Sequence, residues 1–463
     1  MYLGLKQSGL TLGEAARFCA GELRGASPEA RFYSYSTDSR AVSGGELFFA
    51  LSGERFDAHA FVPEVIAAGA LCAVVSKPQA ENIPHILVSD TKTALGAFAK
   101  NYYALFSSLT VGVTGSVGKT TTKEFIAAVL AEKYETAKTA GNFNNEIGLP
   151  KTLLAFEAPQ NALVAEMGMS ARGEISRLTR IALPDIAVIT NIGSSHLENL
   201  GTRENIALAK LEITEGLAKG GLLIANGDEP LLKNAKNTFE NTRFVSLIDK
   251  NCDYFAYNIK EEGGFTSFCY KSPACDHKTV SIPAHGKHNV YNALCAIAVG
   301  EAAGMNSAQI ERGLAAFKGA AMRAEAKKHG AFTVVEDCYN ASPESMRASI
   351  DVLCSGAYGA GRKIAFLGEM RELGAQSPKM HFEVGAYAAK AGVGLLFTFG
   401  KAAEEIALGA ESAGMPRESI FRITDVENAE AAAEALKEKL EKDDIILFKA
   451  SRALKLERVS AKI

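Results

Sequence analysis

The chain has 463 residues, which exceeds the roughly 250–300 residues that usually share one hydrophobic core and predicts two or three domains. Hydrophobic residues make up 47% of the chain and charged residues 22%, a composition that is typical of a folded globular protein and excludes a disordered one. Lys+Arg number 50 and Asp+Glu 53, so the net charge of -3 excludes a broad basic field; we expect no nucleic-acid partner and a local cluster for any anionic substrate.

The first residues, MYLGLKQSGLTLGEAARF, lack the charged start, apolar stretch and cleavage site of a signal peptide. The longest uncharged apolar run, residues 65–76, is shorter than the roughly 18 residues of a membrane span. The eight cysteines include no C-x-x-C pair, which argues against a zinc site and a disulfide framework and predicts reduced thiols. We therefore expect a cytoplasmic protein with no membrane span.

Strands and helices alternate along most of the chain. Residues 1–88 predict a small α/β unit that contains the segments STDSRAVSGGELFFAL and GALCAVVS. From about residue 89 the pattern predicts a helix, then the strand LTVGVT, a glycine turn and the helix TTKEFIAAVLAEK. Further apolar strands follow at ALVAEMG, DIAVITNI and GLLIANGD. Such alternation is typical of a mostly parallel sheet that helices cover on both faces.

After about residue 322 the alternation starts again. Strands are predicted at FTVVEDC, KIAFLGEM, VGLLFTFG, FRIT and DIILFKAS, with helices between them such as PESMRASIDVLC and MHFEVGAYAAKAG. The first of these strands is not followed by G-x-G-x-x-G, so the fingerprint of a dinucleotide-binding domain is missing. The sequence thus predicts three α/β domains, at residues 1–88, 89–322 and 323–463.

The segment VGVTGSVGKTT, residues 111–121, lies between a predicted strand and a predicted helix, the context of a phosphate loop. Glycines let backbone N–H groups turn toward phosphate oxygens, Lys119 can reach the terminal phosphates, and Thr120 can ligate magnesium. The strict pattern G-x-x-x-x-G-K-[ST] is not met, because position 113 is Val. A glycine turn that only joins strand to helix is the alternative. No N-K-x-D segment is present, which argues against a small GTPase, whereas kinases and motor ATPases stay open on this motif alone.

Three side chains downstream are candidates for metal and phosphate chemistry: Glu166 in ALVAEMG, His196 in TNIGSSHLENLG and Lys210 in ENIALAKLEI. Groups that follow the carboxyl ends of parallel strands face the ligand crevice, so Glu166 and His196 are expected to converge on the phosphate loop. There they would hold magnesium. The alternatives are a loop histidine with its own partners and a surface lysine paired with Glu204 or Glu215.

The segment AGNFNNEIGLP, residues 140–150, is dense in amides. Asn142, Asn144 and Asn145 either cap a helix and turn the chain, or orient a substrate.

These segments together resemble the Mur ligase family over nearly the whole chain, most weakly at residues 228–280. The central match rests on VGVTGSVGKTTTKE, GNFNNEIGLP, AEMG, ITNIGSSHLENLGT, AKLEI and HGKHNVYNALCAIAVG. The first and third domains, through STDSRAVSGGELFFALSGERFDAHAFV, DCYNASPESMRASIDVL and FLGEMRELGAQSPKMHFEVG, are most similar to the member that adds D-alanyl-D-alanine to UDP-N-acetylmuramoyl-tripeptide. The resemblance implies a small N-terminal UDP-binding domain, a central P-loop ATPase domain and a C-terminal Rossmann-like domain.

The resemblance also implies roles for matching residues. The UDP-substrate would be held by the GERFDAH turn and by Thr37, Asp38, Ser39, Arg40, Phe48, Asn142, Asn144 and Asn145. ATP would be bound by Gly115, Ser116, Val117, Gly118, Lys119, Thr120, Thr121, Asn289, Asn292, Arg323 and Asp337. The dipeptide would meet Tyr339, Asn340, Ala341 and Ser342, with Lys449, Ser451 and Arg452 near the same site. Many members have Gly where Ala450 stands.

The lysine that matches Lys210 carries a carbamate in the family, which turns a cation into a ligand for a second magnesium ion. The implied metal ligands are therefore Thr120, Glu166, His196 and carbamylated Lys210, with two Mg²⁺ ions, and the implied catalytic residues are Lys119, Lys210, His196 and Glu166. A carbamate needs a neutral amine, and burial and nearby positive charge both lower the pKa of a lysine.

The implied activity is ATP-dependent amide-bond formation through an acyl phosphate by a monomer. The nearest alternatives are the ligase that adds the third residue of the peptide and a folylpolyglutamate synthase. The segment DCYNASPESM favours the dipeptide-adding enzyme, and no D-N-P-R segment for diaminopimelate is visible. A P-loop regulator that hydrolyses ATP slowly is an alternative from a different class. The sequence leaves open whether the tripeptide ends in lysine or diaminopimelate.

Overall fold

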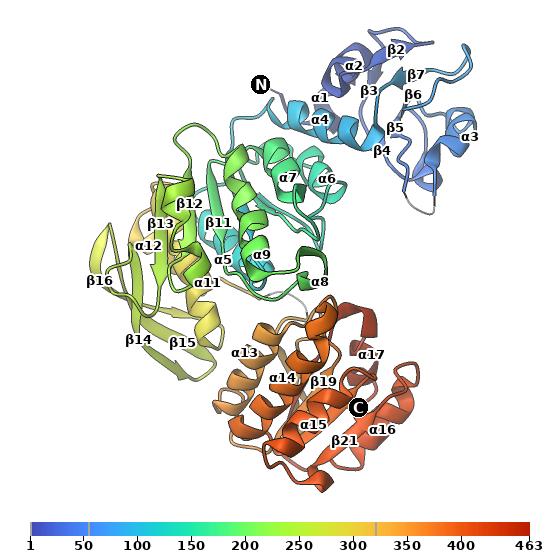
Figure 1. Cartoon of the computed structure of the whole chain (residues 1–463). Helices are drawn as coiled ribbons and strands as arrows, with labels where there is room; N and C mark the ends of the chain where they lie inside the picture. The colour runs from blue at the N-terminus through green and yellow to red at the C-terminus, as the bar shows by residue number, and fades with distance from the viewer. Residues whose placement is uncertain (1, 54–55, 320–321) are drawn as a thin grey trace.

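The computed structural model describes residues 2–53, 56–319 and 322–463, and the side chain of Thr238 is not described. The residues Glu54 and Arg55 of the GERFDAH turn therefore lie outside the described residues. Three α/β bodies follow one another in chain order, with the N-terminal and C-terminal bodies at opposite ends and the central body between them (Figure 1). Each large sheet falls within one of the three predicted ranges, whose boundaries stay a prediction.

The N-terminal body is built on a five-stranded sheet of order β2-β7-β6-β5-β4, in which only the β2–β7 pair is antiparallel. Apolar residues of β5 and β6 form its core. Its elements are α1 Leu5–Ser8, β1 Leu10–Thr11, α2 Leu12–Cys19, β2 Glu22–Arg24, β3 Arg31–Phe32, β4 Tyr35–Ser36, η1 Ser39–Ala41, β5 Leu47–Phe49, η2 Ala58–Phe61, α3 Val62–Ala67, β6 Cys72–Val75 and β7 His85–Leu87.

The central body contains a nine-stranded sheet of order β16-β15-β14-β13-β12-β11-β8-β10-β9. Its elements are α4 Thr91–Tyr103, β8 Leu109–Thr114, α5 Lys119–Leu130, β9 Thr136–Lys138, α6 Gly148–Leu154, β10 Ala162–Glu166, α7 Glu174–Ala182, β11 Ile186–Ile189, α8 Leu197–Leu200, α9 Arg203–Leu211, η3 Glu212–Gly216, β12 Leu222–Asn226, η4 Pro230–Leu232, α10 Ala235–Thr238, β13 Thr242–Ser246, β14 Tyr254–Glu262, β15 Phe265–Ser272, β16 Cys275–Ile282, α11 Lys287–Ala302 and α12 Ser307–Ala315.

Helices cover both faces of this sheet, as the apolar strands predicted. Along β10, Leu163 and Ala165 pack toward α6, α7 and α9, whereas Ala162 and Val164 pack toward α5, α11 and α12. The strands from β9 to β14 run parallel, and β14, β15 and β16 continue the sheet as an antiparallel meander. This meander lies in the region of weakest resemblance, and the sequence analysis did not predict it.

The C-terminal body is a six-stranded sheet of order β17-β18-β22-β19-β20-β21. Only its β17–β18 pair is antiparallel, and α13–α15 cover one face while α16 and α17 cover the other. Its elements are β17 Glu325–His329, β18 Phe332–Glu336, α13 Pro343–Cys354, β19 Lys363–Gly368, η5 Gly374–Gln376, α14 Ser377–Ala391, β20 Leu395–Phe399, α15 Glu404–Ser412, η6 Arg417–Ser419, β21 Ile420–Ile423, α16 Ala429–Lys437, β22 Ile445–Lys449, η7 Arg452–Leu454 and α17 Glu457–Ser460.

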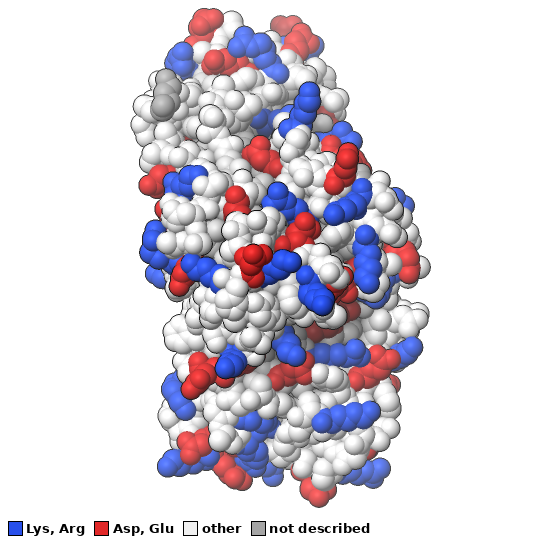
Figure 2. All heavy atoms as spheres, turned by 90° about the vertical axis from the view of Figure 1, so that its left-hand side faces the viewer, with Lys and Arg blue, Asp and Glu red and all other residues white. Residues whose placement is uncertain are grey.

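Charges on the surface are mixed. Figure 2 shows Lys and Arg interspersed with Asp and Glu over one face of the molecule. All eight cysteines lie in the described segments and are free thiols, as predicted. Within these segments, no helix is long and apolar enough to cross a membrane.

Candidate active site

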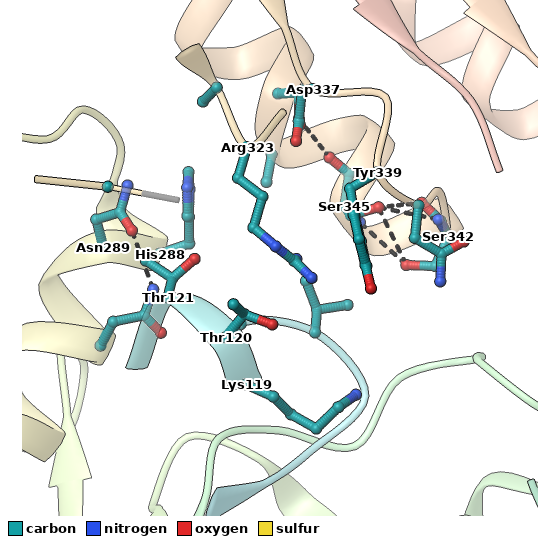
Figure 3. A pocket seen from close by; sticks show the side chains of 18 of the residues that line it. Lys119, Thr120, Thr121, His288, Asn289, Arg323, Asp337, Tyr339, Ser342 and Ser345 are labelled. Carbon is teal, nitrogen blue, oxygen red and sulfur yellow. Dashed lines mark hydrogen bonds between the residues drawn. The ribbon is translucent and has the colours of Figure 1, made fainter. Parts of the chain in front are cut away.

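A cleft of about 920 Å³ lies between the central and C-terminal bodies. The central body contributes the phosphate loop, the end of β10 and the start of α11, and the C-terminal body contributes the segment from β18 to α13 (Figure 3). Segments far apart in the sequence therefore meet at the carboxyl ends of the central parallel strands, where an open α/β sheet binds its ligands.

The phosphate loop joins β8 to α5 and depends on two glycines. Gly115 and Gly118 have φ angles of 150° and 82°, which favour glycine, and a Cβ at Gly115 would meet Thr190 Oγ1 at 1.8 Å. The loop is anchored to the turn after β11, because Val117 N–H donates to Asn191 Oδ1 at 3.0 Å and Ser116 N–H donates to the Asn191 carbonyl at 3.1 Å. The sequence analysis did not single out Asn191; its position directly after an apolar strand was the available signal.

Lys119 is the first residue of α5, and its side chain turns back along the loop. Its ammonium donates to the Gly115 carbonyl at 2.8 Å. Burial lowers the pKa of Lys119, and the charge of Glu166 opposes that shift. The cleft is lined by Ser116, Val117, Gly118, Lys119, Thr120 and Thr121. Gly115 shapes the turn of the loop but is not among the lining residues.

Glu166 ends β10 beside the loop and is 3% exposed. Its two oxygens accept hydrogen bonds from Thr120 Oγ1 at 2.9 Å and from Asn144 Nδ2 at 2.8 Å. The Nζ of Lys123, which is also buried, lies 3.8 Å from Glu166 Oε2. A carboxylate and a hydroxyl that face a phosphate site are oxygen ligands of the kind that magnesium prefers.

His196 also lines the cleft, but its partner comes from the C-terminal body. Its Nδ1 lies 2.5 Å from the Glu372 carboxylate, and both residues have a φ of 65°. The hydrogen bond from His196 lowers the pKa of Glu372. The sequence analysis did not single out Glu372.

Lys210 lies in the last turn of α9 and is 1% exposed, which differs from the alternative of a surface lysine paired with a glutamate. Glu215, one of those glutamates, pairs with Arg180. Burial first, and the charge of Lys119 second, lower the pKa of Lys210 well below its usual value. Lys210 does not line the cleft itself, although it lies within electrostatic reach of the phosphate-loop lysine.

Asn289 and Asn292 line the cleft on α11 and are bonded to each other. Thr122 Oγ1 donates to Asn292 Oδ1 at 2.8 Å, Asn292 Nδ2 donates to Asn289 Oδ1 at 3.0 Å, and Asn289 Nδ2 donates to the His285 carbonyl at 2.7 Å. This chain of bonds fixes α11 against the phosphate-loop helix. It uses much of the hydrogen-bonding capacity with which these two asparagines were expected to bind ATP.

The C-terminal wall of the cleft carries the residues expected from the third domain. The Arg323 guanidinium lies over the Tyr339 ring at 4.5 Å and extends toward Thr120 (Figure 3). Asp337 accepts a hydrogen bond from Lys449 at 2.6 Å and one from Ser349 at 2.5 Å. Asn340 and Ala341 also line the cleft, as does Ser342, which caps α13. Ser451 and Arg452 are not among the lining residues.

The segment expected to hold the UDP end lies outside the cleft, in the N-terminal body. Asp38 caps η1, and hydrogen bonds from Arg40 first, with a smaller effect of Lys151 in α6, lower the pKa of Asp38 to about 2. Thr37 and Ser39 flank Asp38 in this turn. The Arg40 guanidinium is exposed and pairs with Asp38 at 2.6 Å. Phe48 is fully buried in the core of this body, where it supports the sheet, and its part in holding the UDP-substrate stays a prediction.

The three asparagines of residues 140–150 have different surroundings. Asn144 contacts Glu166, whereas Asn145 Oδ1 accepts the Gly148 N–H at 2.9 Å at the start of α6, which is the capping alternative. Asn142 is exposed and does not line the cleft.

Comparisons with known proteins agree with this architecture. Three family models match: the Mur ligase middle domain over residues 113–300, the Mur ligase glutamate ligase domain over 322–452 and the Mur ligase family catalytic domain over 31–103. The UDP-N-acetylmuramoyl-tripeptide--D-alanyl-D-alanine ligase of Bacillus subtilis is 43% identical over 92% of this chain and 92% of its own. The crystal structure of MurF from Acinetobacter baumannii has a TM-score of 0.90 at 29% identity and covers 100% of this chain and 99% of its own. The crystal structure of MurF ligase from Thermotoga maritima in complex with ADP has a TM-score of 0.84 at 31% identity, and it covers 93% of this chain and 96% of its own.

Proposed function

The chain belongs to the Mur ligase family, and from this membership we propose that it joins D-alanyl-D-alanine to UDP-N-acetylmuramoyl-tripeptide with ATP, in peptidoglycan synthesis. The observation that carries the proposal is the cleft, in which the phosphate loop with Lys119 and Glu166 faces Arg323 and Tyr339 of the C-terminal body. An ATP-dependent ligase needs a phosphate-binding site and, facing it, a second surface that binds the amine substrate.

The first step activates the carboxylate at the end of the tripeptide. A carboxylate oxygen attacks the γ-phosphorus of ATP, a new O–P bond forms, and the bond between γ-phosphorus and ADP breaks. Phosphoryl transfer needs positioning and neutralisation of charge rather than a nucleophilic side chain. Lys119 and the backbone N–H groups of the loop supply positive charge on one side of the phosphates, and Arg323 extends toward them from the other.

The residues at the end of β10 fit a magnesium ion. Thr120 and Glu166 offer oxygen ligands, and no group of three or more His, Cys, Asp or Glu side chains able to hold a metal ion is found in the described part of the chain. Magnesium is commonly bound by one or two protein oxygens together with substrate phosphates. When bound there, it would neutralise charge on the phosphoryl group in transfer. His196 could join this set through Nε2 while its Nδ1 keeps the contact with Glu372.

In the second step the amine of D-alanyl-D-alanine attacks the acyl carbon. A C–N bond forms, the C–O bond to phosphate breaks, and the departing phosphate takes up the proton that the nitrogen loses. The acyl phosphate would hydrolyse in water, so the two walls of the cleft must exclude solvent while it exists. The contacts that already join the walls, such as Ser194 with Glu344, support such closure.

The carbamate on Lys210 is supported by the burial of this residue and by its lowered pKa, because a neutral amine is the form that reacts with carbon dioxide. A carbamate would give the site a second anionic metal ligand. ¹³C NMR of the protein in labelled bicarbonate should give a carbamate signal that Lys210→Ala lacks. Activity of Lys210→Ala within about a factor of two of the unchanged chain, less than 0.5 kcal/mol, would remove the carbamate from the mechanism.

The UDP end of the substrate is proposed to bind the N-terminal body near Thr37 and Arg40. An arginine and hydroxyls suit a diphosphate, for which Arg40 would exchange its contact with Asp38. The monomeric state, the cytoplasmic location and the number of magnesium ions stay predictions.

The experiment that tests the function supplies UDP-N-acetylmuramoyl-tripeptide ending in lysine or diaminopimelate, with D-alanyl-D-alanine and ATP, and measures phosphate release and product mass. We expect release to require both substrates and the product to contain the dipeptide. Phosphate release with no acceptor would favour the P-loop regulator, and use of a single amino acid in place of the dipeptide would favour the third-residue ligase or a folylpolyglutamate-type enzyme.

A further inference from the structure

Glu344 is a carboxylate of the cleft for which the chemistry described above provides no role. It lies in the first turn of α13, two residues after Ser342, and it lines the cleft. Its Oε1 accepts a hydrogen bond from Ser194 Oγ of the central body at 2.7 Å. Its Oε2 is buried and has no hydrogen-bond partner among the described residues. A buried carboxylate oxygen without a donor is costly, so such a group calls for an explanation.

The Glu344 carboxyl lies against the phosphate loop. A Cβ added to Gly193 would meet Glu344 Oε2 at 3.0 Å on one side and Ser116 Cβ at 3.1 Å on the other. The Gly193 N–H in turn donates to Ser116 Oγ at 2.8 Å. The carboxyl is thus held between the loop that binds the phosphates and the 339–342 segment that is expected to meet the dipeptide.

Other acidic groups around the cleft already have donors. Glu166 is bonded to Thr120 and Asn144, Asp337 to Lys449 and Ser349, and Glu372 contacts His196. Glu344 differs because its unpartnered oxygen is buried. The second substrate brings the matching donor, since an α-amino group with a pKa near 8 carries a proton at neutral pH and must be held beside the acyl phosphate.

We propose that Glu344 Oε2 binds the amino group of the incoming dipeptide and sets it beside the reacting carbon. This assignment rests on the proposed function. Glu344 would contribute a charge-assisted hydrogen bond, which recognises an acceptor by its free amine. The bond from Ser194 would hold the carboxyl at the cleft, and Oε2, which is buried in this arrangement, would be uncovered when the amine binds.

The test is Glu344→Gln, which keeps the shape and an acceptor for Ser194 but removes the charge. We expect the KM for D-alanyl-D-alanine to rise by about 10- to 100-fold, the range of a hydrogen bond to a charged group, with the KM for ATP changed by less than about threefold. Propanoyl-D-alanine, which has the shape of the dipeptide but no amino group, serves as a competitive inhibitor. Its Ki should be the same in the unchanged chain and in Glu344→Gln.

Ser194→Ala is the matched control, because it removes the hydrogen bond of Glu344 to the central body and keeps the carboxylate. We expect it to raise the KM for the dipeptide far less than Glu344→Gln does. An equal rise in both variants, or an equal change in the Ki of propanoyl-D-alanine, would mean that Glu344 only joins the bodies and would overturn the proposal. A rise confined to the KM for ATP would overturn it in favour of a nucleotide contact.

Glu344→Asp provides a second variant if the glutamine variant does not fold. It keeps the charge but shortens the reach, so it should retain part of the preference for the dipeptide over its des-amino analogue. Equal binding of the two compounds by the unchanged chain would also overturn the proposal. Failure of the proposed function is distinct, since the unchanged chain would then form no dipeptide-containing product.

Discussion

Single side chains at the cleft are oriented by partners that lie far away in the sequence. Glu166 is held between Thr120 and Asn144, and Lys119 contacts the carbonyl of Gly115. Such bonds fix the position of a group before its reaction, which lowers the cost of reorganisation during catalysis. Predictions for these residues therefore concern charge and protonation.

Lys119→Ala should abolish ATP turnover, with a loss of at least about 100-fold in kcat, because the phosphates lose their cation. Binding of the UDP-substrate should change by less than about twofold, since Arg40 lies in another body, outside the cleft. Phosphate release and calorimetric titration with the UDP-tripeptide measure the two effects. Loss of both together would argue against separate sites.

His381 is a buried side chain whose role depends on its being neutral. Its Nε2 accepts the Met370 N–H at 2.9 Å, its Nδ1 contacts the Ser377 carbonyl at 2.7 Å, and burial lowers its pKa. The imidazole of the unfolded chain takes up a proton as the pH falls through about 6.5, whereas that of the folded chain does so only at lower pH. The stabilising contribution of His381 is therefore present above pH 6.5 and is lost as the pH falls below this value.

His381→Leu should lower the free energy of unfolding by about 1–3 kcal/mol at pH 8, because the Met370 N–H loses its acceptor. The difference in the free energy of unfolding between the unchanged chain and the variant should narrow between pH 6.5 and pH 5, by at most about 1.4 kcal/mol per pH unit. Urea unfolding at several pH values measures it. A difference that is constant with pH would contradict the neutral assignment.

At the scale of elements, α13 links the C-terminal body to the phosphate loop. The sequence predicted its bounds well, because Ser342 caps the helix with Ser345 and Pro343 occupies its first turn. Its position beside Gly193 was not predictable, since periodicity gives the buried face of a helix but not the neighbour. Gly193 has no side chain, and this allows the close approach.

Gly193→Ala should separate α13 from the loop, because its Cβ would meet both the Glu344 carboxyl and Ser116. Overpacking typically costs about 1–3 kcal/mol, so kcat should fall by about 10- to 100-fold. The clash lies between two bodies that can move apart, so the thermal midpoint should change little. A large fall in the thermal midpoint with an unchanged kcat would mean that the substitution destabilises the fold and does not displace α13 from the phosphate loop.

The elements that the sequence predicted are those with strong local signals. Apolar runs bounded by glycine and charge predicted β8, β10, β11 and β19, and the glycines before Lys119, between a strand and a helix, predicted the phosphate loop. The antiparallel β14–β16 meander was missed because the resemblance is weakest there and its strands mix polar with apolar residues. The burial of Phe48 and the mutual bonding of Asn289 and Asn292 depend on which way a side chain points, and no motif states this.

At the scale of the whole molecule, the central body lies between two others and shares the cleft with only one of them (Figure 1). The central and C-terminal bodies are joined by the contacts of His196 with Glu372 and of Ser194 with Glu344, and by the Glu198 N–H, which donates to the Glu372 carbonyl at 3.1 Å. Both His196 and Glu372 have positive φ angles, a backbone conformation that side chains other than glycine adopt at a cost.

Glu372→Gln should loosen the closed arrangement, because it removes one charge of this contact. A partly exposed pair is worth about 0.2–1 kcal/mol, so the closed fraction should fall by up to about fivefold relative to the open one. X-ray scattering with ADP bound, at low and high salt, measures the effect. A radius of gyration equal to that of the unchanged chain at both salt concentrations would exclude a role in closure.

The separation of the Thr37–Arg40 turn from the cleft has a consequence for what the protein accepts. The turn and the C-terminal body lie toward opposite ends of the molecule, with the phosphate loop between them (Figure 1). If the diphosphate binds at this turn, as proposed, the substrate would reach Lys119 only when the peptide it carries is long enough. The spacing between the two bodies would then act as a ruler that rejects precursors with missing residues, without any side chain having to read them.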